Sequence, residues 1–170
     1  MGHVSVLQDD RGGQDPVFHG GQGRAVRQEV FAGDGHLRGP LERRAAQLGV
    51  AHATRFVGFQ NAWGLRDLYK ACECVCVPSR NEPFGIVILE AWSAGKPVIA
   101  SENGGPSELI WHNVTGFKIY PNPHSVSWGI TTLFSNFDHA RWMGANGRHT
   151  AKKDFSWDHI AEQTLSVYKS

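Results

Sequence analysis

Glu82 and the turn that follows it are the residues best suited to chemistry in this sequence. Glu82 comes soon after a short apolar run that ends at Pro78, and we expect it in a loop at the carboxyl end of a strand. Ligands of open α/β sheets bind at that edge. The chain then turns at Gly85 into a predicted helix, whose first N–H groups, at Gly85, Ile86 and Val87, have no partner within the helix. These donors and the helix dipole favour an anion such as a phosphate.

Glu90 is the second candidate, because it is the one charged residue between Pro83 and Gly95. Its neighbours three and four positions away on a helix are small or apolar: Ile86, Val87, Ser93 and Ala94. A carboxylate in such surroundings is costly unless it is hydrogen-bonded, and a pair of ligand hydroxyls would satisfy it. The alternative is an exposed helix edge, or a pair with Lys96.

The segments around these glutamates alternate between strand-like and helix-like. The expected strands are 28–32, 54–59, 73–77, 97–101 and 116–120, with 4–7 as a further candidate. The expected helices are 37–48, 63–72, 85–94, 107–110, 125–134, 139–153 and 157–168. This alternation predicts a single α/β domain over residues 26–170, with a Rossmann-like, doubly wound parallel sheet. Residues 1–25 form a divergent, glycine-rich N-terminal segment, for which we expect loop or poor order over 8–25.

Composition excludes several classes of protein. The 170 residues carry a formal net charge of +1, which gives no reason to expect nucleic acid or an anionic membrane as a partner. No apolar run reaches the ~20 residues of a membrane span, and no signal-peptide pattern opens the sequence, so we expect a cytoplasmic protein. The three cysteines, Cys72, Cys74 and Cys76, have the spacing of buried strand residues rather than of metal ligands. We expect no metal and no cofactor.

Glu82 and Glu90, with seven residues between them, resemble the Glu-x7-Glu motif of retaining glycosyltransferases. The wider sequence is similar to glycosyltransferase family 4, which includes glycogen synthases, sucrose synthases and mannosyltransferases. The similarity covers residues 29–170 and rests on an ordered set of segments: Gly33–Gly35, Phe56–Phe59, Val77–Ser79, Glu82–Gly85, Glu90–Ala91, Gly95–Ala100 and Val114–Gly116. It implies the C-terminal half of a GT-B architecture, the half that binds a nucleoside-diphosphate sugar.

The resemblance assigns roles to five residues at the sugar and the diphosphate. Glu82 is the catalytic residue and faces the hydroxyls of the donor sugar. The backbone of Phe84, Gly85 and Ile86 contacts the sugar and the diphosphate, with Val87 beside them. The implied reaction is glycosyl transfer with retention, which needs no metal because the helix N-terminus and basic groups stabilise the departing diphosphate.

Four further residues are assigned to the nucleoside by the same resemblance. Glu90 would hold the two ribose hydroxyls. Gly58 and Phe59 would lie near the base, and Gly33 would line the same pocket.

The sequence departs from the family in two places. Family members carry an Arg and a Lys in the loop after their first strand. The corresponding stretch here, Asp9–Gly13, has no lysine. Either sequence divergence or a frame error in translation would explain this difference. We also expect the acceptor-binding N-terminal domain to be missing from this chain, and the chain alone to transfer nothing. The helix at 157–168 carries an apolar stripe that should dock, and without a partner domain some of it should be exposed and favour self-association.

Two other functions are alternatives to donor binding. A non-catalytic binding or interaction domain, a truncated or decayed transferase copy, is favoured by the missing basic residues and disfavoured by the intact pair of Glu82 and Glu90. A dinucleotide-dependent oxidoreductase needs a Gly-x-Gly-x-x-Gly turn after the first strand, which this sequence lacks.

Overall fold

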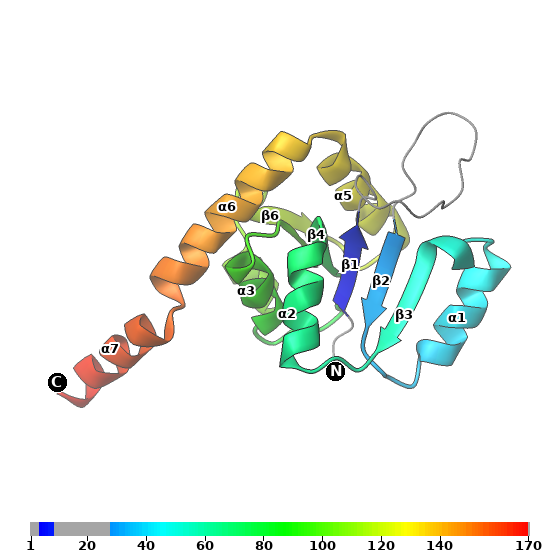
Figure 1. The fold of residues 1–170 in the computed structure, drawn as a ribbon. Helices are drawn as coiled ribbons and strands as arrows, with labels where there is room; N and C mark the ends of the chain where they lie inside the picture. The colour runs from blue at the N-terminus through cyan, green and yellow to red at the C-terminus, as the bar shows by residue number, and fades with distance from the viewer. Residues whose placement is uncertain (1–3, 9–27, 170) are drawn as a thin grey trace. The chain divides into compact units, whose positions relative to one another are not determined.

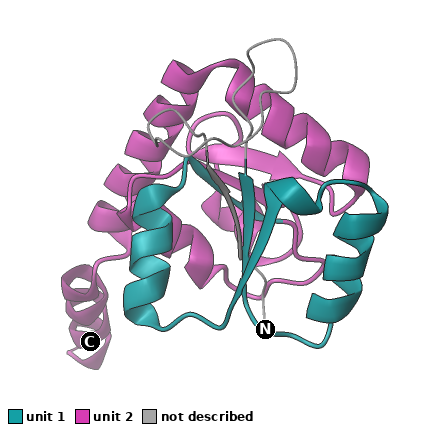
Figure 2. Cartoon of the chain, turned by 45° about the vertical axis from the view of Figure 1, so that its right-hand side comes forward, with its two compact units in different colours: residues 1–77 teal, residues 78–170 magenta. Residues whose placement is uncertain are grey.

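The computed structural model describes residues 4–8 and 28–169 of the chain (Figure 1). It divides into two compact units, residues 1–77 and 78–170 (Figure 2). The loop predicted over residues 8–25 falls, from residue 9 onward, outside the described residues.

Unit 1 holds four strands, in the order β3-β2-β1-β4, and the helices between them. Its elements are β1 (Val4–Gln8), β2 (Gln28–Ala32), α1 (Arg38–Gln47), η1 (Ala51–Ala53), β3 (Thr54–Gly58), α2 (Ala62–Ala71) and β4 (Cys74–Val77). β2 and β3 pair in parallel, as predicted. β1 runs antiparallel to both of its neighbours, β2 and β4. This orientation was not predicted, because alternating strands and helices indicate parallel pairing only where a crossover helix joins the strands.

Unit 1 is held together by apolar contacts along its strands. The rings of Phe31 on β2 and Phe56 on β3 stack with centroids 4.9 Å apart. All four residues of β4 are buried. Cys74 and Cys76 lie in β4, whereas Cys72 caps the C-terminus of α2 rather than belonging to the strand. All three thiols are buried and free, so they act as small apolar side chains.

Unit 2 begins with the segment that contains both glutamates. Its elements are α3 (Ile86–Ser93), β5 (Val98–Ser101), α4 (Gly105–Leu109), β6 (Gly116–Ile119), α5 (Pro123–Ser135), α6 (Phe137–Asp154) and α7 (Trp157–Tyr168). β5 and β6 pair in parallel, with Val98 opposite Gly116 and Ser101 opposite Ile119. The parallel pairing and the flanking helices confirm the predicted fold class.

The core of unit 2 is built around the indole of Trp92 on α3. Trp92 is fully buried, and its Nε1 donates a hydrogen bond of 3.0 Å to the carbonyl of Thr115. Ile88 on α3, Ile99 on β5 and Met143 on α6 are also fully buried. These contacts hold α3 against α6 and fix the position of the helix that the sequence places at the site.

α7 does not pack as the sequence predicts. Ser156 caps the N-terminus of the helix as expected, because its hydroxyl accepts a hydrogen bond from the backbone N–H of His159. None of its residues is buried, however, and Trp157 is 87% exposed. The expectation that the apolar stripe docks is therefore wrong for these residues, while the expectation that part of it is exposed is confirmed.

Candidate functional site

The turn from Glu82 to Gly85 connects the loop of unit 2 to α3. Gly85 is buried and adopts a left-handed conformation, with φ of 97°, which favours glycine. Its N–H donates to Oε1 of the half-buried Glu82 at 3.1 Å. The sequence predicted an unpaired N–H at Gly85, and this is wrong because the Glu82 side chain folds back over its own turn. The carboxylate and the turn therefore form one rigid unit.

The first turn of α3 keeps two open donors. The N–H groups of Ile86 and Val87 have no hydrogen-bond partner among the described residues, in agreement with the prediction. The side chains beside them, Phe84 and Ile86, are 51% and 61% exposed. An anion that approaches this helix end meets free N–H groups and the positive end of the helix dipole.

Glu90 lies one helical turn beyond Ile86 on α3. It is exposed, so the expectation that it sits in apolar surroundings is wrong. The reason is that Ile86, its neighbour four positions earlier, is itself exposed and forms an open face rather than core. Glu90 therefore matches the alternative of an exposed helix edge.

Two glycines at the start of α4 hold the Glu82 loop from the other side. The N–H of Gly105 donates to the carbonyl of Glu82 at 2.9 Å. A Cβ at Gly104 would overlap the Glu82 carbonyl oxygen, and one at Gly105 would overlap the backbone of Phe84. Glu82 is thus fixed through its backbone by α4 and through its side chain by Gly85.

Lys118 on β6 supports α4 and was missed by the sequence analysis. Its Nζ donates to the carbonyl of Ser107 at 2.6 Å, and the Ser107 hydroxyl donates to the carbonyl of Gly104 at 2.7 Å. A chain of hydrogen bonds therefore runs from Lys118 through α4 to Glu82. In the sequence, Lys118 is visible only as a polar residue between two apolar ones in a predicted strand. That alternation indicates a second, more polar face of the strand but no role at the site.

In unit 1 the structure brings together Gly33 and Gly58, two of the three residues assigned there to the nucleoside. They follow β2 and end β3, and the N–H of Gly33 donates to the carbonyl of Gly58 at 2.8 Å. The next residue, Phe59, is 78% exposed. The two loops are thus tied at their backbones, and an aromatic ring stands free beside them.

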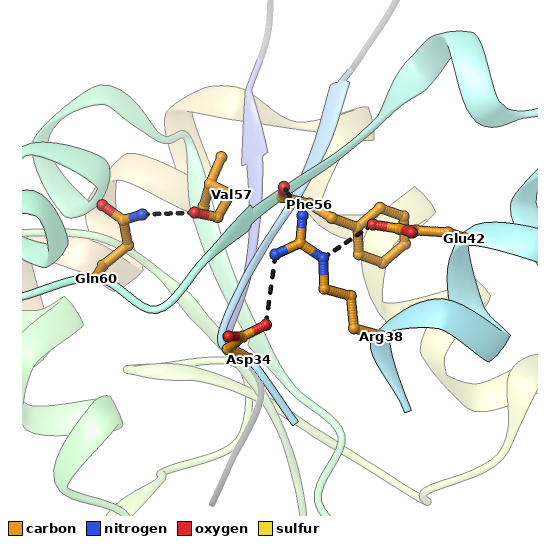
Figure 3. A network of polar contacts seen from close by, with 6 residues as sticks. All are labelled: Asp34, Arg38, Glu42, Phe56, Val57 and Gln60. Atoms are coloured by element: carbon orange, nitrogen blue, oxygen red, sulfur yellow. Dashed lines mark hydrogen bonds and ion pairs between the residues drawn. The ribbon is translucent and has the colours of Figure 1, made fainter. Parts of the chain in front are cut away.

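Arg38, at the start of α1, links the loop after β2 to the strand β3 (Figure 3). Its guanidinium donates to Glu42 at 2.9 Å, to Asp34 at 3.4 Å and to the carbonyl of Phe56 at 3.3 Å. The hydrogen bonds to Glu42 and then Asp34 raise the pKa of Arg38 above its ordinary value. The residue was not singled out from the sequence, although Asp34, Arg38 and Glu42 have the four-residue spacing of helical ion pairs.

Two general features concern the described ranges, 4–8 and 28–169. No three His, Cys, Asp or Glu side chains gather there as ligands for a metal ion. No helix within those ranges has the length and apolar character to cross a membrane.

Residues 24–150 match the family of glycosyl transferases group 1, so the chain belongs to that family. Among curated relatives, it is 44% identical over 141 residues to an uncharacterized glycosyltransferase of Methanocaldococcus jannaschii, with 82% of this chain and 36% of the relative covered. It is 33% identical to a D-inositol 3-phosphate glycosyltransferase of Jonesia denitrificans, with 77% of this chain and 31% of that protein covered. The chain therefore spans about a third of the length of these relatives.

Among solved structures, the chain resembles the Anabaena protein HepE in complex with UDP. The TM-score is 0.75 at 30% identity, over 82% of this chain and 40% of HepE. HepE has also been solved with UDP-glucose. Together with the family match, this likeness identifies the fold as that of a GT-B C-terminal domain.

Proposed function

We propose that this chain is the donor-binding part of a retaining hexosyltransferase and that it binds a nucleoside-diphosphate sugar in unit 2. The turn that joins Glu82 to Gly85 at the start of α3 is the observation that carries this proposal. A rigid carboxylate lies there beside a helix end with two open N–H donors. The UDP and UDP-glucose complexes of HepE support the choice of ligand.

Each part of the turn has a distinct task in this proposal. The N–H groups of Ile86 and Val87 bind the diphosphate, whose charge the helix dipole stabilises as the bond to the sugar breaks. One oxygen of Glu82 holds Gly85, which leaves the other to accept a sugar hydroxyl and orient the ring. Glu90 accepts the ribose hydroxyls. No metal takes part, because the helix end supplies the positive potential.

For unit 1 the proposal extends to the assigned residues there. Phe59 offers an exposed ring to a nucleobase, since base–aromatic stacking tolerates any base. The backbone tie between Gly33 and Gly58 keeps that ring in a defined place. Replacing Phe59 by alanine is expected to weaken nucleotide binding while it leaves the fold intact, because the ring is exposed.

A nucleotide titration tests the proposal directly. We expect UDP, GDP or ADP to shift the amide NMR signals of Gly85, Ile86 and Val87, with a dissociation constant of about a millimolar. Glu90→Gln should weaken binding by roughly 1.5–3 kcal/mol, the range for a hydrogen bond to a charged group. Glu162→Gln, an exposed glutamate on α7, is the matched control. If none of the three nucleotides moves these signals at high millimolar concentration, the proposal fails.

The same titration in a chelator tests metal independence. We expect the dissociation constant to stay within a factor of about two, because the site as proposed needs no cation to hold the diphosphate. A loss of affinity of more than about tenfold, equal to 1.4 kcal/mol, would show that a divalent ion bridges the phosphates.

We further propose that these 170 residues bind donor but transfer no sugar by themselves. Transfer requires donor and acceptor to be held at reacting distance, and that positioning supplies much of the rate. The chain covers about a third of its relatives, so much of the surface that could position an acceptor lies beyond it. Incubation with radiolabelled UDP-glucose and a panel of sugar acceptors should give no labelled product. Labelled product above the level of a Glu82→Ala control would contradict this.

A non-catalytic binding domain is the second candidate, and the absence of lysine from Asp9–Gly13 favours it. It differs from the first in one measurable respect. A decayed copy would bind neither nucleotide nor nucleotide sugar, whereas a donor domain binds both, so the titration separates the two.

A further inference from the structure

A pocket of about 400 Å³ opens on unit 2, and none of the residues assigned to the donor lines it. Its walls come from the end of α4, the turn at 111–115 and the last turns of α6. No residue from 82 to 90 lines it. Its volume lies in the range of small-ligand sites, so the pocket raises the question of what it binds.

The backbone of the turn that carries the lining residue Trp111 is held by several hydrogen bonds. The N–H of Trp111 donates to the Thr115 hydroxyl at 3.0 Å, and its carbonyl accepts from the N–H groups of Val114 and Thr115, each at 3.0 Å. Asn146 on α6 ties the same turn to that helix by donating to the carbonyl of Val114 at 3.0 Å. Trp111 itself is 71% exposed, so a fixed backbone presents an accessible indole at the pocket, and an indole supplies a large contact area with only two side-chain torsions to order.

The polar lining of the pocket offers side chains of both signs, with more carboxylates than ammonium groups. The carboxylates of Glu108 and Asp154, the ammonium group of Lys153 and the imidazole of His149 line it. Within the described part of the chain none of these four side chains makes a hydrogen bond or ion pair. The pocket therefore offers both acceptors and donors, fixed to two helices, with no protein partner to displace.

The lining also has an apolar part. Leu109 and Phe155 line the pocket from α4 and from the end of α6. Leu109 also packs near the Gly85 turn, where its Cδ1 would lie 3.4 Å from a Cβ at that glycine. The lining thus combines an indole, two apolar side chains and several ionisable groups.

We infer that this pocket binds a neutral saccharide, as a glycan site separate from the donor site. A sugar ring presents C–H groups on one face, which suit the negatively polarised face of an indole. Its hydroxyls donate to carboxylates and accept from lysine or histidine, which matches Glu108, Asp154, Lys153 and His149. A carbohydrate bound here would keep a glycan chain on unit 2 independently of the reaction.

Other ligand classes fit this lining less well. A phosphate or a nucleotide would meet the two carboxylates, and like charges in contact disfavour binding. An apolar peptide would remove four ionisable side chains from water without supplying partners, at a cost of about 1–3 kcal/mol for each unsatisfied group. A neutral polyol satisfies both signs of charge at once.

NMR titration of the isotopically labelled chain with glucose, maltose and cellobiose tests this inference. We expect the Trp111 indole signal and the amides of residues 149–154 to shift with at least one of these sugars. Trp111→Ala should weaken that binding about three- to tenfold, the size of an aromatic contact. Trp142→Ala removes another half-exposed tryptophan of unit 2 outside the pocket and should leave it unchanged.

A second variant and a second ligand complete the titration. Glu108→Gln, at an exposed position, should weaken sugar binding about threefold to tenfold. It tests the same pocket if Trp111→Ala does not fold. Glucose 6-phosphate should bind more weakly than glucose. The inference is overturned if Trp111→Ala and Trp142→Ala lose the same sugar affinity, or if none of the three sugars shifts the signals. It is also overturned if glucose 6-phosphate binds more tightly than glucose. UDP titration of Glu90→Gln reports on the donor site alone, so failure of one proposal is distinguishable from failure of the other.

Discussion

At the scale of single residues, Glu82 depends on two glycines that cannot carry a side chain. Its carbonyl accepts the N–H of Gly105, and Gly104 packs directly against that carbonyl with φ of 72°. A side chain at Gly104 has to move the loop that holds the carboxylate. The position of Glu82 is therefore set by the close approach of two backbones and not by side-chain packing alone.

Gly104→Ala should consequently disturb both stability and the site. Gly95 has the same φ of 72°, but a Cβ there would meet only the Arg148 side chain at 3.8 Å. Gly95→Ala therefore measures backbone strain without a clash. We expect Gly104→Ala to lower the free energy of unfolding by about 1–3 kcal/mol more than Gly95→Ala, the usual cost of overpacking. Urea unfolding measures both, and equal losses would contradict the close approach.

Two thiols in β4 make unit 1 sensitive to alkali. Burial raises the pKa of Cys76 from 9.0 to about 12 and raises the pKa of Cys74 well above its ordinary value. The unfolded chain loses these protons above pH 9.0, whereas the folded chain keeps them. Their contribution to stability is complete below pH 9.0 and is lost as the pH rises toward 12.

The expected result is a fall in unfolding free energy between those two pH values. The slope should reach up to about 1.4 kcal/mol per pH unit for each thiol. Denaturant unfolding at a series of pH values measures it, and Cys74→Ala and Cys76→Ala should each make the slope shallower. A slope unchanged in both variants would assign the alkaline loss to other groups.

At the scale of elements, α4 is too short to be stable through its own hydrogen bonds. Its five residues are held by contacts with other elements of unit 2. Lys118 binds the Ser107 carbonyl, and Gly105 binds the Glu82 carbonyl. α4 therefore transmits the position of β6 to the loop that carries Glu82.

Lys118→Met tests this role of α4. Loss of the ammonium should reduce the free energy of unfolding by about 1.5–3 kcal/mol, the range for a hydrogen bond to a charged group. It should also shift the Gly105 and Gly85 amide signals in the absence of any nucleotide. Lys118→Arg should restore part of both effects, and Lys152→Met, an exposed lysine on α6, should show neither. Unchanged amide signals in Lys118→Met would separate Lys118 from the site.

Most elements could be predicted because periodicity and turn residues mark them locally. The strand at 28–32 and the helix over 86–93 lie where the apolar patterns and glycines place them. The antiparallel β1, the bond from Gly85 to Glu82 and the exposure of Glu90 were not predicted. Each depends on a tertiary arrangement: strand direction, a side-chain rotamer and the packing of the neighbouring residue. None of these leaves a periodic signal in the sequence.

At the scale of the whole molecule, α7 is the long helix of unit 2 that has no buried residue. Its side chains Trp157, Leu165, Val167 and Tyr168 are all more than half exposed, with Trp157 at 87%. Apolar surface of this kind in one helix favours association, because water is released when it is covered. The helix contributes no buried residue, so the core of unit 2 does not depend on it.

Removal of residues 157–170 should therefore separate association from folding. We expect the complete chain to increase in average mass with concentration, and the truncated chain to remain monomeric in sedimentation equilibrium. The truncated chain should keep the same urea midpoint within error, because it loses no buried side chain. Leu165→Ser with Tyr168→Ser, both on exposed positions of the helix, should reproduce the truncation with the helix still present. A complete chain that stays monomeric at every concentration, or a truncated chain that still associates, would show that α7 does not provide the contact surface.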